Sequence, residues 1–376
     1  MKGKAMFEKQ LSLRQIGASV FALVVFAGLC SISLVAQNRH RDNSVYLMTN
    51  KTHNSIIQFL RDPDGLLKRV REIPTGGSGT GPTGVDPLGS QDSLVLSGDG
   101  HLLLAVNAGS NELSILEVNA GGNLSWRDKV SSGGEFPNSV ALSGDLVYVL
   151  NAKGAKPNIN GFRLDPDGSL NAIPGASVDL PPGSAGANDI RFADDGTKLL
   201  VTVSGTNRIL VFEVGDNGIA GAPSPQASAG AMPFGIRFGR NGIALVSEAA
   251  GSVSSYGFDS MDNLMVISSA VPDGQRASCW ISLNRSATYA YISNTGSGTL
   301  SSYQIDGTGA LTLLNSVAAD TGGAPIDTSV SRDSQFIYVV DSAAGRVVIL
   351  QVNGGNLTPI GSVSSLPTSI QGIAAQ

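Results

Sequence analysis

Two side chains of this sequence have the types and positions that ester hydrolysis requires. Glu248 directly follows an apolar run that we expect to be a strand, and Arg276 lies just before a later apolar run. A carboxylate can activate water as a general base, and a guanidinium can stabilise the negative charge that develops on the carbonyl oxygen. If the chain is an enzyme, this pair would suit a carboxylic ester hydrolase with Glu248 and Arg276 as its catalytic residues. The alternative is that Glu248 is a solvated glutamate in a turn.

Histidine and serine chemistry has little support in this sequence. It contains 3 histidines, and no Gly-x-Ser-x-Gly motif marks a serine nucleophile. His40 lies near the N-terminus, and His101 follows an Asp-Gly turn. His53 lies in a turn after a predicted strand, as Glu248 does, so it is the histidine that could share a face with Glu248. A Ser-His-Asp triad needs three converging groups and is therefore not predicted.

The composition also argues against several partners and cofactors. The formal net charge is −5, and the absence of a basic stripe argues against nucleic-acid binding. The glycine-rich stretch 76–84 lacks the lysine and the following helix of a phosphate-binding loop. We therefore expect neither a nucleic-acid partner nor a cofactor.

A strand–turn–strand unit is repeated along most of the chain. Its clearest copy is residues 96–116, LSGDGHLLLAVNAGSNELSIL, where a Gly-Asp-Gly turn separates two apolar strands and a short polar turn opens a third. The marker that ends the second strand recurs seven times, at intervals of 44 to 57 residues. Such periods are typical of four-stranded propeller blades. The marker residues are Asn50, Asn107, Asn151, Val203, Ser247, Asn294 and Asp341.

These repeats predict an all-β fold, a seven-bladed β-propeller over residues 43–376. The chain has seven markers, but only six predicted first strands lie between them. The first blade therefore begins directly with its second strand. The missing inner strand is best supplied by residues 368–374, because a strand from the far terminus would close the ring without unpaired edges. We expect one closed domain and a monomer.

The N-terminal residues 1–36 predict an export signal. A basic start containing Lys2 and Lys4 is followed by an uncharged apolar run at 16–35 and a cleavage site at Ala36. The mature chain is then expected to be periplasmic or secreted. The run of about 20 residues is also long enough to span a bilayer, so an uncleaved anchor is the alternative, and the only membrane contact expected.

From residue 44 to the C-terminus, the sequence resembles the lactonase-type seven-bladed propellers, which include propeller 6-phosphogluconolactonases and carboxymuconate-lactonizing enzymes. The repeated blades carry the resemblance, above all LSGDGHLLLAVNAGSNELSIL, FADDGTKLLVTVSGTNRILVF and VSRDSQFIYVVDSAAGRVVIL. So do outer turns such as Asp165-Pro166-Asp167-Gly168. The resemblance implies hydrolysis of a sugar or carboxylic lactone at one mouth of the central channel, where inner strands begin and second strands end.

The family's site uses a histidine, two arginines and a glutamate at that mouth, and this chain departs from the pattern. In the fifth blade Pro233-Phe234-Gly235 stands where Pro-Arg-His is typical, whereas Ser247-Glu248 keeps the glutamate. In the sixth blade Thr295 stands where an arginine is common. Glu248 and Arg276 are therefore the catalytic residues that the resemblance supports. The side chains expected to bind a ligand at the same mouth are Asn188, Asp189, Asn294, Asp341 and His53.

Two further arginines lie inside predicted inner strands. Arg191 and Arg237 occupy matching positions, and an unpaired buried charge is costly, so we expect each to pair with a carboxylate such as Asp189 or Asp327.

The polar residues that end the second strands could in principle form an oxygen-rich metal site. Calcium generally requires more than two carboxylates, and Asn and Asp at strand ends commonly hydrogen-bond to the backbone of the turn. We therefore expect no metal.

Two functions remain open from the sequence. One is hydrolysis of a small lactone or carbohydrate-like substrate. The other is an exported, non-catalytic propeller that binds a protein, a glycan or a small ligand. Convergence of Glu248 with an arginine at the channel mouth would favour the enzyme, and an uncharged mouth lined by asparagines would favour the binding module.

Overall fold

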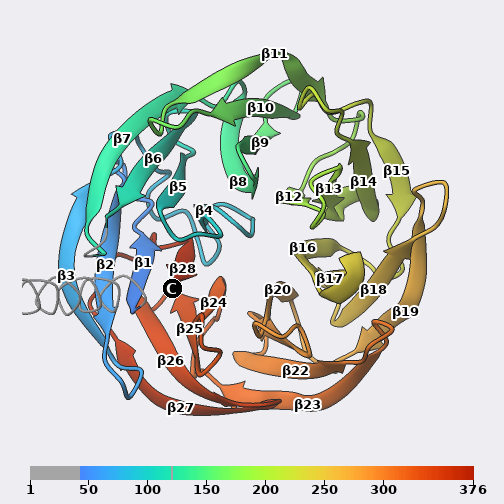
Figure 1. Ribbon diagram of the computed structural model, residues 1–376. Helices are drawn as coiled ribbons and strands as arrows, with labels where there is room; N and C mark the ends of the chain where they lie inside the picture. Colours follow the sequence, from blue (N-terminus) through green and yellow to red (C-terminus); the bar gives the residue numbers. More distant parts are fainter. Residues whose placement is uncertain (1–42, 120–121) are drawn as a thin grey trace, which may run out of the picture.

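Seven four-stranded antiparallel sheets are arranged in a ring around a central channel (Figure 1). The structure is a computed structural model that describes residues 43–119 and 122–376. The expected signal or anchor, residues 1–36, lies outside these described residues. Within them, no helix has the length and apolar character that a membrane span requires. The prediction of an all-β seven-bladed propeller is confirmed.

The blades are numbered along the chain, and each has an inner, a second, a third and an outer strand. The inner strands of blades 1 to 7 are β28 (Ile373–Ala375), β4 (Leu94–Leu96), β8 (Glu135–Ser143), β12 (Ala187–Phe192), β16 (Pro233–Phe238), β20 (Ser278–Leu283) and β24 (Thr328–Val330). The second strands are β1 (Ser44–Met48), β5 (Leu102–Asn107), β9 (Leu146–Lys153), β13 (Lys198–Val203), β17 (Ala244–Glu248), β21 (Tyr289–Asn294) and β25 (Phe336–Asp341).

The remaining strands form the outside of the ring. The third strands are β2 (Ser55–Arg61), β6 (Glu112–Val118), β10 (Asn158–Leu164), β14 (Arg208–Glu213), β18 (Ser252–Phe258), β22 (Thr299–Ile305) and β26 (Arg346–Asn353). The outer strands are β3 (Leu67–Pro74), β7 (Leu124–Ser131), β11 (Leu170–Asp179), β15 (Ser224–Ala227), β19 (Leu264–Pro272), β23 (Leu311–Asp320) and β27 (Asn356–Val363). Two short 3-10 turns, η1 (Ser204–Thr206) and η2 (Arg240–Gly242), lie in the connections.

The C-terminal strand β28 joins the sheet of β1, β2 and β3 as its inner strand. The sequence predicted this pairing, because blade 1 has no inner strand of its own at the N-terminal end. Its register pairs Val45 with Ala375 and Leu47 with Ile373. The strand is shorter than the predicted range 368–374 and shifted toward the C-terminus, although Gly372 still accepts a hydrogen bond from the Met48 N–H, at 2.9 Å. The two ends of the described chain therefore meet in one blade.

Strand direction gives the ring two distinct faces. Inner strands begin and second strands end on one face, which we call the Glu248 face because Glu248 ends β17. Inner strands end and second strands begin on the other, which we call the Arg332 face because Arg332 follows β24. The Asp-Gly turns lie on the Arg332 face. In one of them, Gly100 has a φ of +73°, and the Asp99 carboxylate accepts the His101 N–H at 3.0 Å.

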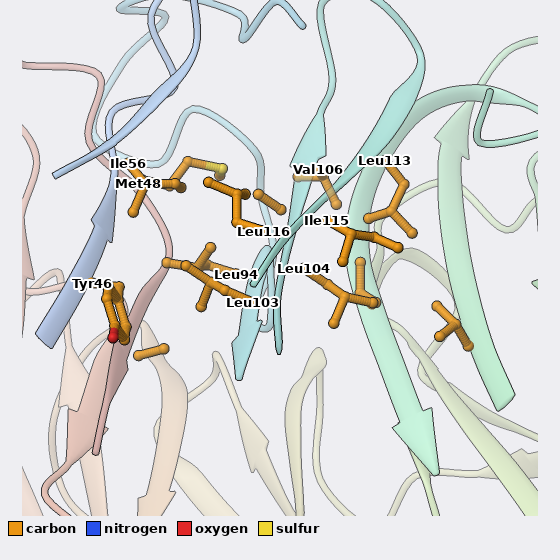
Figure 2. Close-up of a cluster of buried hydrophobic side chains, with 14 of the residues drawn as sticks. Tyr46, Met48, Ile56, Leu94, Leu103, Leu104, Val106, Leu113, Ile115 and Leu116 are labelled. Atoms are coloured by element: carbon orange, nitrogen blue, oxygen red, sulfur yellow. The ribbon is translucent and has the colours of Figure 1, made fainter. Parts of the chain in front are cut away.

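The hydrophobic core lies between neighbouring blades. Figure 2 shows side chains of blades 1 and 2 in contact, with Met48 and Ile56 on one side and Leu103 and Leu116 on the other; all four are 0% exposed. Burial of one such side chain contributes about 2 kcal/mol to folding. Each blade covers the face of the next, and the buried apolar side chains form six clusters around the ring.

Candidate functional site

The centre of the channel is crossed by residues 86–92, which we call the channel segment. It belongs to the connection from β3 to β4, and in Figure 1 the loops beside β4 reach toward the middle of the ring. Ser90 is 0% and Gln91 1% exposed, so the segment is packed inside the ring. The channel therefore contains protein from blade 2 and is not lined by inner strands alone.

Hydrogen bonds tie the channel segment to inner strands on opposite sides of the ring. The Ser90 hydroxyl donates to the Asn138 carbonyl of β8 at 2.7 Å, and the Trp280 indole N–H of β20 donates to the Ser90 carbonyl at 2.9 Å. The Gln91 side-chain oxygen accepts the Ile281 N–H at 2.8 Å. These polar groups lie where water is scarce, so each bond satisfies a group that would be costly to leave unpaired.

Asp92, at the end of the channel segment, binds two arginines from different blades. Arg237 of β16 donates two hydrogen bonds to the Asp92 carboxylate, both 2.8 Å, and Arg191 of β12 donates a third at 2.8 Å. The Asp92 side chain is 9% exposed, whereas that of Arg191 is 35% exposed. Both arginines are paired, as the sequence predicted, but the hydrogen-bonded carboxylate is that of Asp92 and neither of the two suggested partners.

A cavity of about 420 Å³ opens from this cluster on the Arg332 face. Its charged side chains are Asp92, Arg191, Arg237 and Arg332, and the rest of its wall comes from the ends of β4, β24 and β28 and the turn after β4. The structure therefore brings one carboxylate and three guanidinium groups to a single cavity in the channel. A concave site with a few convergent polar groups is a candidate place for a small ligand.

A neutral carboxyl group lies behind this cavity. Burial, together with the nearby Asp92, raises the pKa of Asp327 to about 8. One Asp327 oxygen accepts the Thr328 N–H at 2.9 Å. At neutral pH Asp327 is therefore mostly protonated, and it does not cancel the positive charge of the arginines.

Glu248 does not face the channel mouth, which corrects the placement expected from the sequence. It is 0% exposed, and its carboxylate accepts hydrogen bonds from the Gly230 N–H at 2.9 Å, from the Ser254 hydroxyl at 2.5 Å and from the Ser252 hydroxyl. Burial raises its pKa. The physical reason is that the side chain folds back against β18 and the preceding connection, where buried donors satisfy it.

The residues that end other second strands make the same kind of contact. The Asn107 amide donates to the Ser114 hydroxyl at 2.7 Å, and the Asn151 amide donates to the Asn158 side-chain oxygen at 2.8 Å. Asn294 contacts the Ser301 hydroxyl at 2.7 Å. Each bond joins the end of a second strand to the third strand of its blade. Glu248 thus occupies the position of a repeated structural bridge.

The other residues predicted for the mouth are dispersed. Arg276 is exposed, and its guanidinium donates to the Gly296 carbonyl at 2.8 Å. His53 is exposed in a turn, Asn294 is buried in the bridge described above, and Asp341 is buried and pairs with Arg346 at 2.9 Å. Within the described part of the chain, no ion pair joins Glu248 to an arginine.

Asn188 and Asp189 do lie at the channel, but as supports of the channel segment. The Asn188 amide donates to the Gly89 carbonyl at 2.7 Å. The Asp189 carboxylate accepts the Ile236 N–H at 2.7 Å and the Ser139 hydroxyl at 3.0 Å, and Asp189 is 0% exposed. These two residues therefore fix the segment that presents Asp92.

Sequence reasoning missed Asp92 because its neighbours give no motif. The one available signal was the length of the connection before β4. A connection longer than the others contains enough residues to cross the channel. Asp92 also has a φ of +60°, which the sequence does not reveal. For a metal, the described residues contain no group of three or more His, Cys, Asp or Glu side chains placed to hold an ion.

Comparisons with known proteins agree with this architecture. A family model described as lactonase, 7-bladed β-propeller, matches residues 89–181 and 239–369. No curated protein matches the chain. Similar solved structures include the periplasmic gluconolactonase of Pseudomonas aeruginosa, with a TM-score of 0.70, 17% identity, and 86% of this chain and 97% of that chain covered.

A second similar structure is a protein of Bacteroides fragilis described as a 6-phosphogluconolactonase. Its TM-score is 0.65 and its identity is 18%, with 87% of this chain and 97% of that chain covered. At these identities the solved structures establish the shared fold alone.

Proposed function

This chain belongs to the lactonase family of seven-bladed β-propellers, and we propose that it hydrolyses a small lactone in the cavity on the Arg332 face. The observation that carries the proposal is the convergence of Asp92, Arg191 and Arg237 on that cavity. A sugar lactone or another carboxylic lactone is the substrate class that the family supports, although this cavity opens on the face opposite the mouth that the resemblance implied.

Lactone hydrolysis would use these three residues in distinct roles. Water attacks the ring carbonyl carbon while the Asp92 carboxylate, whose Oδ1 accepts one bond from Arg237, takes a proton from that water. The Arg191 guanidinium, more exposed than that of Arg237, stabilises the oxyanion. The bond from the carbonyl carbon to the ring oxygen then breaks, and the proton passes to the leaving oxygen, which gives a hydroxy acid.

The roles proposed from the sequence for Glu248 and Arg276 remain a competing assignment within the same function. Glu248 is shielded from water by Ser252, Ser254 and Gly230, so it could act only after this part of blade 5 opens. The two assignments differ in which variants should lose lactone turnover, so measuring turnover in both sets of variants distinguishes them.

The test is turnover of a panel of hexonic γ- and δ-lactones by the purified chain and four variants. Arg191→Gln and Asp92→Asn remove the groups proposed here, whereas Glu248→Gln and Arg276→Gln remove the groups proposed from the sequence. We expect turnover to fall at least about a hundredfold in the first two, as for the loss of an oxyanion donor or a base, and to persist in the second two. Circular dichroism and thermal unfolding check that each variant is folded.

Two results would contradict this assignment. Activity that survives Arg191→Gln but vanishes in Glu248→Gln would locate the chemistry in blade 5. A folded chain without turnover on any lactone would favour the second candidate, a propeller that binds a small ligand without converting it. The observation favouring that candidate is the pairing of Asp92 with two arginines, because both carboxylate oxygens already accept hydrogen bonds from guanidinium groups.

We also propose that the chain is exported, on the basis of the basic start and the apolar run 16–35. The test is fractionation of cells that express the full chain, with mass spectrometry of the mature N-terminus. A new N-terminus after Ala36 would support cleavage, and an intact N-terminus in the membrane fraction would support the anchor. Soluble, uncleaved protein inside the cell would refute export.

A further inference from the structure

The turns on the Arg332 face that join inner to second strands differ in charge around the ring. In blades 5, 6 and 7 the second residue of this turn is an arginine: Arg240, Arg285 and Arg332. In blades 2, 3 and 4 the same turns carry acidic residues and no arginine: Asp99, Asp145, Asp194 and Asp195. One half of the channel rim is therefore basic in a chain with a net charge of −5.

We call Arg240, Arg285 and Arg332 the arginine row. Hydrogen bonds link the neighbouring turns, since the Arg240 side chain donates to the Ser286 carbonyl at 2.6 Å and the Arg285 N–H donates to the Ser334 hydroxyl at 2.8 Å. All three arginines are exposed. Among the residues that the structure describes, none of the three has an ion-pair partner. Three guanidinium groups without an ion pair thus follow one another along the rim, and at the blade 5 end Asp194, Asp195 and Asp262 line a hollow beside the turn of Arg240.

A hollow of about 440 Å³ lies at the blade 6 to blade 7 end of the row. It is lined by Asn43, Arg61, Arg285, Arg332 and Asp333. Its only acidic residue, Asp333, is bound by Arg61 at 2.7 Å, so the charges of Arg285 and Arg332 remain available to a ligand. Arg332 also lines the channel cavity, which makes the two spaces neighbours.

We propose that the arginine row binds an acidic polysaccharide, with guanidinium groups on successive blades holding successive carboxylates of the chain. Planar guanidinium groups bind carboxylates through paired N–H donors. The arginines form a row along the rim, so a ligand with repeated anionic groups can engage all of them. Arg240 and Arg285 do not line the cavity proposed for lactone hydrolysis, whereas Arg332 does, and binding to the row does not require turnover.

The surroundings of the row favour a glycan over a protein partner. None of the large exposed apolar side chains of the described chain lies in the three turns of the row: Trp126 and Val317 are on outer strands, and Met261 is in the outer turn of blade 5 on the same face. Protein interfaces generally have an apolar or aromatic centre, whereas the turns of the row offer hydroxyl and amide groups from residues such as Asn241 and Ser286. Hydroxyl-rich, hydrated sugars suit such a surface.

The test measures binding of a short oligogalacturonate by isothermal titration calorimetry, beside a neutral oligogalactose of the same length and poly-L-glutamate. The variants are Arg285→Gln and the double variant Arg240→Gln with Arg285→Gln. The matched control is Arg208→Gln, an exposed arginine at the start of β14 on the Glu248 face. We expect each row substitution to weaken oligogalacturonate binding about tenfold, as for loss of a charge-assisted hydrogen bond, and the control to leave it unchanged.

Several outcomes would overturn the proposal. The first is no binding of oligogalacturonate, and the second is that Arg208→Gln weakens oligogalacturonate binding as much as the row substitutions do. The third is that poly-L-glutamate binds more tightly than oligogalacturonate, which would indicate an acidic protein partner. Lactone turnover is measured on the same samples. Because Arg285 lies outside the channel cavity, unchanged turnover with weakened binding separates this surface from the proposed active site.

Discussion

The Asp92 carboxylate accepts two hydrogen bonds of 2.8 Å from the Arg237 guanidinium, although the residues are 145 positions apart in the chain. The bonds join the segment that crosses the channel to the inner strand of blade 5. This pair therefore holds the channel segment against blade 5.

Breaking the Asp92–Arg237 pair should strongly destabilise the fold. Asp92→Asn leaves Arg191 and Arg237 side by side without their counter-charge, so we expect the free energy of unfolding to fall by about 3 kcal/mol or more. Urea unfolding of Asp92→Asn, Arg237→Gln and the double variant measures the coupling. The control is Arg163→Gln, whose pair with Asp145 is exposed and should be worth at most about 1 kcal/mol. Equal effects in the two pairs would contradict the buried role of Asp92.

Glu248 should behave as a structural residue in unfolding experiments. Glu248→Ala removes the acceptor of the Gly230 N–H and of two serine hydroxyls, so we expect a loss of about 3 kcal/mol from unsatisfied buried donors. Glu248→Gln keeps one oxygen as an acceptor and should cost less than half as much. Equilibrium unfolding in urea compares the two variants. If Glu248→Ala is as stable as the unmodified chain, the bridge between β17 and β18 contributes nothing.

The contribution of Asp327 to the stability of the chain should decrease with rising pH. Its pKa is raised to about 8 in the fold, whereas an aspartate in the unfolded chain has a pKa near 4. Between about pH 4 and pH 8 the folded state therefore holds a proton that the unfolded state has released. The contribution of this group to stability falls as pH rises through that window and then levels off.

The variant Asp327→Asn isolates this effect, because its side-chain oxygen can still accept the Thr328 N–H. Unfolding at about pH 5 and about pH 8 should show a smaller difference in the variant than in the unmodified chain. The exposed Asp306→Asn is the control: hydrogen bonds from Thr308 lower the pKa of Asp306, so its contribution changes only in more acidic solution and the substitution should leave the difference between about pH 5 and about pH 8 unchanged. A pH dependence that is unchanged in Asp327→Asn would refute the assignment.

Gln91 should be essential for holding the channel segment in place. Gln91→Ala leaves the Ile281 N–H without its acceptor and removes the 3.3 Å contacts to Asp189 and the Ile236 carbonyl. We expect a loss of about 2 kcal/mol in the free energy of unfolding and faster amide exchange at Ile281. Gln304→Ala, at an exposed position of β22, should change stability by less than about 0.5 kcal/mol. Unaltered exchange at Ile281 would show that the segment does not depend on Gln91.

Local pattern was sufficient to predict the blades. Alternating apolar residues and Asp-Gly turns, as in residues 96–116, are signals that involve only neighbouring residues. The strands and their order can therefore be predicted from the sequence alone. The sequence contains one inner strand too few for seven blades. This predicted that the C-terminal segment would pair with β1, because a closed ring leaves no strand edge unpaired. The repeat also predicted a hydrogen-bonding role for Asn107 and its counterparts, but the predicted partner was the backbone of the turn, whereas the Asn107 amide donates to a side chain of the third strand.

What the sequence by itself determined was therefore the repeating unit, the number of blades and the structural role of their polar strand ends. The tertiary structure alone decided which charged groups meet. Asp92 meets Arg191 and Arg237 only because ring closure brings blade 2 opposite blades 4 and 5, and Glu248 is buried only because a neighbouring connection covers it. Strand patterns depend on adjacent residues, whereas a site in a ring depends on contacts between residues that the sequence separates by whole blades.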